Sequence, residues 1–157
     1  MLRSALRILG VIVGGFAALF AALFVWLYFA TEPSKDEVAS VISPDGKFVA
    51  KLIEINGGAT TSFEYLVTVA EAGTFSKAHE AASLYGAVRN ASAYGANLRW
   101  TSPREVTVEY LDAKSSELLL PKFRLSNAEV TVVLRPEVTD AAAPAGGMLY
   151  NLQGRRQ

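Results

Sequence analysis

The run LRWTSPREVTVEY, residues 98–110, decides the fold class. In its second half Val106, Val108 and Tyr110 alternate with polar residues, which is the two-residue period of a strand that buries one face. Residues 101–104 have the composition of a turn. Leu98 and Trp100, just before this turn, are two positions apart and so lie on the same face of a strand. The run therefore predicts two strands joined by a turn.

Similar short apolar runs, separated by turn residues, occur on both sides of this run. The run at 118–125 contains Pro121, which has no amide hydrogen to donate and so indicates a sheet edge or a bulge. The stretch 76–95 has a weaker pattern, which fits either a weak helix face or a strand running into a loop, and we favour a strand followed by a loop. We expect a mainly β, antiparallel domain over residues 38–137, arranged as a sandwich or a meander. The remaining predicted strands are 38–42, 47–55, 63–69 and 130–134.

The turn between the first two predicted strands has a distinct composition. It reads Ser43-Pro44-Asp45-Gly46, in which proline presets the first central position of a type I turn. Gly46 is expected to take a positive φ, which costs glycine little. The chain is then expected to return as the second strand.

The first thirty residues have a different character. Residues 8–30 read ILGVIVGGFAALFAALFVWLYFA and contain no charge, and at about 1.5 Å of rise per residue they give roughly 34 Å of helix. This length predicts a transmembrane helix. A cleaved signal peptide is the alternative, but its apolar core is only about 7–15 residues long. Tyr28, two positions before Ala30, also disfavours cleavage there.

Charges on the two sides of this helix predict its orientation. Arg3 and Arg7 precede it, whereas the segment that follows, 31–37, is mainly acidic. Because lysine and arginine favour the cytoplasmic side, we expect residues 1–7 in the cytoplasm and the β domain outside it. Residues 31–37 are expected to form a polar linker, and residues 138–157 a flexible tail.

One face of the predicted helix carries small residues at every fourth position. They are Gly10, Gly14, Ala18 and Ala22. Such a ridge lets a second helix approach closely, either from a second copy of the chain or from a larger membrane protein. The alternative is that glycine and alanine are simply common in membrane helices. The lipid bilayer is the partner that the apolar segment itself predicts.

Composition argues against several classes of function. Lysine plus arginine number 15, as do aspartate plus glutamate, and no basic cluster lies beyond the helix, which argues against nucleic acid as a partner. The chain has no cysteine, which excludes disulfides, thiolate metal sites and cysteine nucleophiles. Acidic residues are dispersed along the strands, so no metal site and no cofactor is expected.

The loop at 57–62 is the candidate site. Its glycines expose backbone N–H groups, and three hydroxyl side chains follow within the loop. This composition suits the binding of an anion or a peptide end, although a hairpin connection with locally bonded hydroxyls has the same composition. The candidate residues are Gly57, Gly58, Thr60, Thr61 and Ser62.

A hydrolase built on this loop is the less favoured alternative. It would require His79, the only histidine, to meet a loop hydroxyl together with a carboxylate such as Glu80 or Asp112. The spacing gives no support for such a triad. No catalytic residue is assigned, and the chain is not expected to be an enzyme.

The chain contains, in this order, SPDGK at 43–47, GGATTSF at 57–63 and LRW at 98–100 with VTVEY at 106–110. Together these motifs resemble a family of small, uncharacterised bacterial proteins that are exported or membrane-anchored β proteins. The resemblance covers residues 41–110, and the second motif is its most specific element. Many members have a cysteine just ahead of Gly-Ala-Thr-Thr, where this chain has Gly57. The resemblance implies a location and an architecture, and it implies no activity.

These observations lead to one expectation for the whole chain. We expect a single-pass protein of the bacterial inner membrane whose periplasmic, non-catalytic β domain acts as a binding or accessory module. The competing hypothesis is a structural accessory subunit of a larger membrane complex.

Overall fold

The structure is a computed structural model that describes residues 2–30, 32–73 and 77–143. Within the N-terminal helix, it describes the side chains of residues 10 and 12–26. The chain forms two compact units, Met1–Pro33 and Ser34–Gln157.

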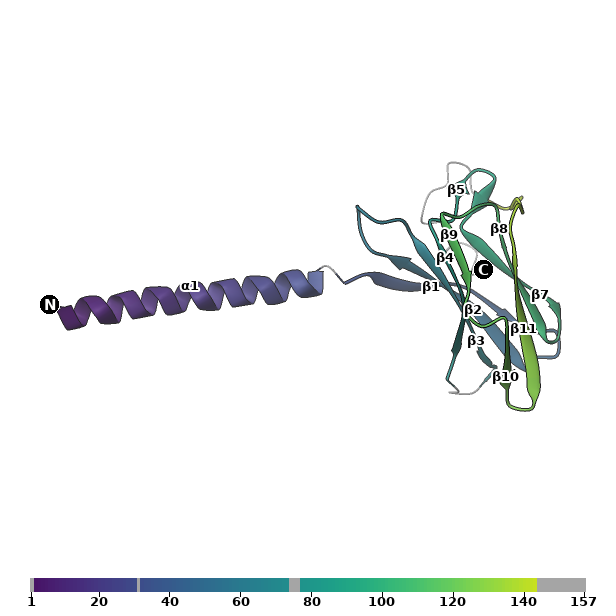
Figure 1. Cartoon of the computed structure of the whole chain (residues 1–157), viewed down its shortest axis with the longest axis horizontal. Helices are drawn as coiled ribbons and strands as arrows, with labels where there is room; N and C mark the ends of the chain where they lie inside the picture. Colours follow the sequence, from purple (N-terminus) through teal and green to yellow (C-terminus); the bar gives the residue numbers. More distant parts are fainter. Residues whose placement is uncertain (1, 31, 74–76, 144–157) are drawn as a thin grey trace. The chain divides into compact units, whose positions relative to one another are not determined.

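The first unit contains the helix α1 (Leu2–Ala30), which has no proline to interrupt it and is rich in alanine and leucine (Figure 1). Among the residues that the structure describes, no helix is both long enough and apolar enough to cross a membrane. The small residues predicted to form a packing face are exposed, and no described atom lies within 4 Å of a methyl group added at Gly10 or Gly14. The face at Gly10, Gly14, Ala18 and Ala22 is therefore open within this unit.

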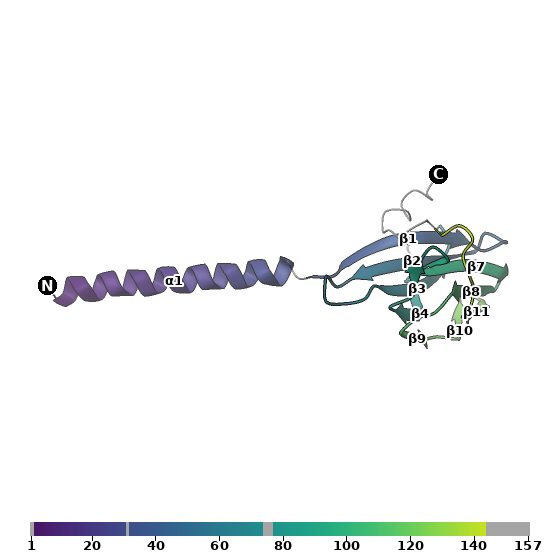
Figure 2. The same cartoon turned by 90° about the horizontal axis from the view of Figure 1, so that it is seen from above.

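The second unit is built from two β sheets that face each other (Figures 1 and 2). Its strands are β1 (Ser34–Ile42), β2 (Phe48–Asn56), β3 (Glu64–Glu71), β4 (His79–Tyr85), β5 (Arg89–Asn90), β6 (Ala93–Tyr94), β7 (Ala96–Ser102), β8 (Glu105–Tyr110), β9 (Ser115–Leu118), β10 (Lys122–Leu125) and β11 (Ala128–Arg135). One sheet has the order β1-β2-β3-β4-β9 and the other has the order β10-β11-β8-β7. The short strands β5 and β6 pair with each other.

The core lies between the two sheets because alternate residues of their strands are buried. Trp100 of β7 stacks on Phe48 of β2 with ring centroids 6.4 Å apart, and its indole N–H donates to the carbonyl of Val41 over 3.1 Å. These contacts close the side of the unit where β7 approaches β1. The largest fully buried side chains are Tyr65, Tyr94, Leu52, Leu84, Val67, Val69, Val106, Val108, Val130 and Val132.

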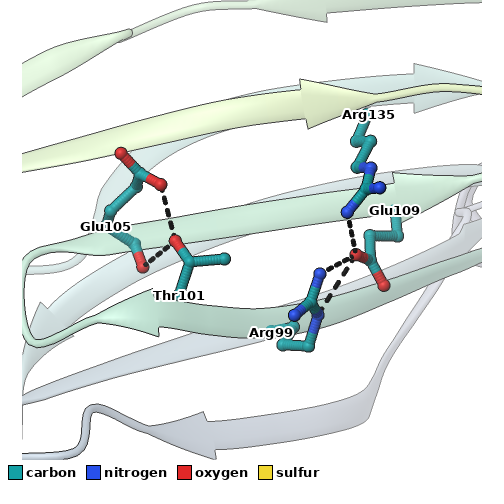
Figure 3. Close-up of polar contacts among 5 residues, drawn as sticks. All are labelled: Arg99, Thr101, Glu105, Glu109 and Arg135. Atoms are coloured by element: carbon teal, nitrogen blue, oxygen red, sulfur yellow. Dashed lines mark hydrogen bonds and ion pairs between the residues drawn. The ribbon is translucent and has the colours of Figure 1, made fainter.

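The outer face of the second sheet carries paired polar side chains (Figure 3). Glu109 accepts a hydrogen bond from Nε of Arg99 over 3.1 Å, and Nη1 of Arg135 lies 3.4 Å from the same carboxylate oxygen. The hydrogen bond to Glu109 raises the pKa of Arg99. Oγ1 of Thr101 donates to Glu105 over 2.6 Å. The side chains around Glu109 thus link the three adjacent strands β7, β8 and β11.

Three features predicted from the sequence are confirmed. The predicted alternation places Tyr65, Val67 and Val69 in the core as consecutive inward residues of β3. The first turn also has the expected geometry, because Gly46 has a φ of +73° and its N–H donates to the carbonyl of Ser43 over 2.8 Å. The domain is mainly β, and its sheets are mainly antiparallel, as predicted.

The predicted linker at 31–37 is shorter than expected, because β1 already begins at Ser34. Ser34 pairs with Asn56 of β2, so polar residues of the segment satisfy their backbone groups in the sheet. An ion pair of 2.9 Å between Lys51 and Glu37 supports the same pairing. All four residues of 34–37 are exposed. Their sequence therefore lacks the alternation of apolar and polar residues from which the start of β1 could have been predicted.

The predicted strand at 118–125 is two strands that belong to different sheets. β9 lies at the edge of the first sheet and β10 at the edge of the second, so the edge position that Pro121 indicated is confirmed. Pro121 lies where the chain crosses between the sheets, and its carbonyl accepts a hydrogen bond from the N–H of Val132 over 2.9 Å. Because proline has no amide hydrogen, it cannot donate a backbone hydrogen bond to either sheet, which suits a position between the two sheets.

The pairing of β11 with β8 is parallel, which departs from the expected antiparallel order. Val132 lies opposite Val106 and Leu134 opposite Val108. A parallel pair needs a crossover connection, and the chain makes it by passing through β9 in the other sheet before β10 and β11.

The two least patterned segments are also described in part. In the stretch 76–95 the predicted strand is confirmed as β4, whereas the predicted loop contains the short paired strands β5 and β6; residue 76 lies outside the described residues. The start of the predicted tail is attached to the domain, because Val138 donates to the carbonyl of Tyr110 over 3.1 Å and Asp140 to that of Ser92 over 2.8 Å. The rest of the predicted tail, 144–157, lies outside the described residues.

Candidate functional site

The predicted binding loop at 57–62 connects β2 to β3 and is held by its own hydrogen bonds. Gly58 has a φ of +95°, and its N–H donates to Oδ1 of Asn56 over 2.9 Å. Thr61 donates to the carbonyl of Gly58 through both its N–H and its Oγ1, each over 3.3 Å. A side chain at Gly57 would approach Oγ1 of Thr61 to 2.6 Å. The two glycines therefore serve the geometry of the turn.

Ser62, the last residue of this loop, contacts two side chains from other segments. Its N–H donates to the hydroxyl oxygen of Tyr85 over 3.0 Å, and its Oγ accepts a hydrogen bond from Nζ of Lys114 over 2.7 Å. The bond from Ser62 lowers the pKa of Tyr85. Two of the three hydroxyl residues of the loop are thus bonded within the domain, and Thr60 stays exposed. The loop is less suited to a ligand than its composition predicts.

His79 lies at the opposite end of β4 from the loop. Tyr85, which bonds Ser62, ends this strand, and His79 begins it. Six residue steps of about 3.3 Å separate them, which is roughly 20 Å. The imidazole instead stacks on the ring of Phe123, with centroids 5.1 Å apart. The structure does not bring the only histidine to the loop hydroxyls, so the geometry gives the hydrolase alternative no support.

A charged network that no sequence pattern indicated is enclosed near the same loop. Glu54, on the inner face of β2, lies 3.6 Å from Nη1 of Arg89 and accepts a hydrogen bond of 2.9 Å from the hydroxyl of Tyr65. The guanidinium of Arg89 also donates to the hydroxyl of Tyr94. Its central carbon lies 3.8 Å from the ring centroid of Phe63 and 4.5 Å from that of Tyr94, which are cation–π distances.

The close packing of this network indicates a structural role. Burial raises the pKa of Tyr65 above its usual range, and the carboxylate of Glu54 raises it further, so the hydroxyl stays a donor. Gly95 has a φ of +71°, and a Cβ at this position would lie 2.3 Å from Cζ of Tyr65. The backbone therefore packs directly on the tyrosine ring and leaves no space there for a ligand.

A cleft of about 440 Å³ opens between the two sheets at the end of β2 that is farther from the loop. Its floor is apolar and consists of Phe48, Leu125 and Ala128, all of which are buried. Turns of both sheets form its rim. We call this feature the inter-sheet cleft, and its volume falls in the range of small-molecule sites.

The rim of the inter-sheet cleft carries charges of both signs. Nζ of Lys47 lies 3.8 Å from Oδ2 of Asp45, whereas the guanidinium of Arg104 makes no ion pair or hydrogen bond with any group that the structure describes. Glu71 accepts a hydrogen bond from the hydroxyl of Ser126. The cleft thus combines two cations, a carboxylate and an apolar floor.

No family model, no curated protein and no solved structure matches the chain. The motif resemblance to a bacterial family therefore stays a prediction. In the structure its first two motifs lie at opposite ends of β2: SPDGK beside the inter-sheet cleft, and GGATTSF at the loop.

Sequence reasoning missed the inter-sheet cleft because its rim comes from separate turns. Lys47 follows the first turn, Arg104 ends the turn between β7 and β8, and Ser126 lies between β10 and β11. Each residue is ordinary for a turn on its own. The SPDGK motif is the one sequence signal at this position, and its composition predicts a turn and not a binding site.

Proposed function

We propose that the chain is a membrane-tethered binding module, in which the segment 8–30 of α1 is the anchor and the inter-sheet cleft of the β domain is the ligand site. The observation that carries the proposal is the cleft itself, an apolar floor rimmed by Lys47, Arg104 and Glu71. Sites for small ligands combine apolar lining residues with a few placed polar groups, and the lining of this cleft is about evenly polar and apolar. The module acts by binding and not by turnover.

Sequence supports the tether. Residues 8–30 contain no charge and correspond to roughly 34 Å of helix, enough for a bilayer core of about 30 Å. Arg3 and Arg7 precede this segment, which favours a cytoplasmic N-terminus and a β domain on the periplasmic side of a bacterial inner membrane.

The bonding of the candidate nucleophiles supports binding rather than catalysis. The hydroxyl oxygen of Ser62 accepts a hydrogen bond from the ammonium of Lys114. His79 stacks on Phe123, away from the loop. A hydrolytic triad needs a nucleophile, a base and an orienting group in mutual contact, and these side chains do not meet.

A second candidate function is that of an accessory subunit held in a larger membrane complex through α1. It is favoured by the open space beside Gly10 and Gly14, which would let another helix approach closely. Replacing Gly14 by leucine would then release the chain from its complex in mild detergent, whereas a tethered module that works alone would not change its size.

Membrane topology tests the tether. We expect the full chain to stay with membranes in alkaline wash and a C-terminal tag to be accessible to protease from outside the inner membrane. Leu19→Arg, at the centre of the segment, should reduce insertion because an arginine there costs about 2.5–3.5 kcal/mol. Leu19→Ile is the matched control and should insert normally. Recovery of the unchanged chain in the soluble fraction, or of its tag in the cytosol, would contradict the proposal.

A further inference from the structure

We propose that the inter-sheet cleft binds a free carboxylate attached to a small apolar group, which is the chemistry of a peptide C-terminus. The inference rests on the proposed binding function and names the class of ligand. It follows from three properties of the cleft: the two cations of its rim, its volume, and the carboxylate of Glu71 on the same rim.

Both cations of the rim are available to an incoming anion. The guanidinium of Arg104 has no bonded partner within the described part of the chain. Among the described residues Lys47 pairs with Asp45 alone, over 3.8 Å, and the other oxygen of Asp45 accepts a hydrogen bond of 2.7 Å from Ser43. Hydrogen bonds between a cation and a carboxylate are among the strongest in proteins.

The backbones that carry these cations are fixed by hydrogen bonds. The carbonyl of Lys47 accepts a bond from the N–H of Ala72, and the carbonyl of Arg104 accepts one from the N–H of Thr131, each over 2.8 Å. The rim therefore does not need to order its backbone when a ligand binds, which reduces the entropic cost of binding.

The floor of the cleft limits the size of the apolar group. Phe48, Leu125 and Ala128 supply the buried surface, and the volume of about 440 Å³ lies at the lower end of the range for ligand sites. One or two aliphatic residues would fill such a space. A long acyl chain would extend beyond the floor into solvent.

Glu71 favours a carboxylate at a peptide end over a phosphate. Its carboxylate lies on the rim and accepts a hydrogen bond from Ser126, so a multiply charged anion would be repelled at close range. A peptide end carries one negative charge and, next to it, an amide N–H that can donate to Glu71 or to the side chain of Asn127. The cations of the rim therefore suit the carboxylate of a peptide end, and the carboxylate of Glu71 or the side chain of Asn127 suits its neighbouring amide N–H.

The test uses the full chain in detergent micelles, with binding followed by amide NMR shifts and by calorimetry. The probes are N-acetyl-glycyl-leucine with a free carboxylate, the same peptide with a C-terminal amide, and inorganic phosphate. We expect saturable shifts at the cleft residues with the free carboxylate and binding about tenfold or more weaker with the amide. Phosphate should bind more weakly than the free carboxylate.

Arg104→Gln removes one cation and should weaken binding of the free carboxylate by about tenfold or more without changing the binding of the amide. Lys51→Gln is the matched control, since Lys51 pairs with Glu37 outside this cleft and should bind as the unchanged chain does.

The outcomes separate the ligand class from the function on which it rests. Equal binding of the acid and the amide at the cleft would overturn the carboxylate assignment and leave the binding module standing. Tighter binding of phosphate than of the free carboxylate would overturn it in favour of a general anion site. Absence of shifts at the cleft with every probe would overturn the ligand class and the cleft as the site of binding, while the tether is judged by the topology experiment.

Discussion

Arg89 and Glu54 form an ion pair inside the β domain, with Nη1 of the arginine 3.6 Å from Oε2 of the glutamate. Their side chains are only 11% and 8% exposed. Charges at this depth lose their hydration, and the pair is tolerated because Tyr65 and Tyr94 bond to it and two aromatic rings face the guanidinium.

Breaking this pair should destabilise the domain strongly. Arg89→Met leaves the carboxylate of Glu54 buried without its cation, and we expect the free energy of unfolding to fall by about 3–5 kcal/mol. The measurement is urea unfolding of the full chain in mild detergent, followed by fluorescence. Because Glu54→Gln removes the orphaned charge, the double variant should recover part of the loss. Unfolding of Arg89→Met at the same urea concentration as the unchanged chain would contradict a role for this pair.

Tyr65 should make the domain sensitive to alkaline pH. Its pKa is raised in the folded state, so above about pH 10 the unfolded chain releases a proton that the folded chain retains, and stability falls as the pH rises. The slope is about 1.4 kcal/mol per pH unit for one such group. Tyr65→Phe should show a shallower loss between pH 10 and 11.5 in the same unfolding measurement. Equal slopes for the two proteins would contradict the raised pKa.

Local sequence patterns predict most of the strands, but they do not indicate which strands lie next to one another in a sheet. The alternation of Val106, Val108 and Tyr110 with polar residues predicts β8, and all three apolar side chains are buried, as is Thr107 on the other face. That β8 lies beside β11 in parallel depends on the path of the chain through β9, which no local pattern contains. The division of 118–125 into two strands escaped prediction for the same reason.

The sites were harder to predict than the strands because their members are distant in sequence. Glu54 occupies an inward position of β2, and its partner Arg89 comes from a hairpin in a segment with little pattern. The loop at 57–62 was identifiable from composition, but composition does not tell whether Ser62 faces a ligand or Lys114. Hydrogen bonds made within the fold decide this.

Gly95 should not tolerate a side chain. Gly95→Ala would place Cβ 2.3 Å from Cζ of the buried Tyr65, in addition to the cost of a non-glycine residue at a φ of +71°. Gly73→Ala is the matched control because Gly73 has nearly the same φ, +72°, and no atom of the described residues lies within 4 Å of the added Cβ. The control should lose about 1–2 kcal/mol of unfolding free energy, and Gly95→Ala more than about 4 kcal/mol. Equal losses of unfolding free energy for the two variants would show that the positive φ sets the cost and that the contact with Tyr65 adds nothing to it.

Glu109 provides the contrast to Glu54, since it also contacts arginines but both of them are largely in solvent and its own side chain is 14% exposed (Figure 3). Arg99 and Arg135, its partners, have side chains that are 52% and 59% exposed, so water and salt screen both contacts. Glu109→Gln should therefore lower the unfolding free energy by no more than about 1 kcal/mol, and the difference should shrink in about 1 M salt. The measurement is urea unfolding at low and high salt beside Glu54→Gln, for which added salt should change the loss little. The prediction is contradicted if Glu109→Gln lowers the unfolding free energy as much as Glu54→Gln does, or if added salt leaves its effect unchanged. Either result would mean that the contacts of Glu109 with the two arginines contribute more to stability than solvent-screened contacts do.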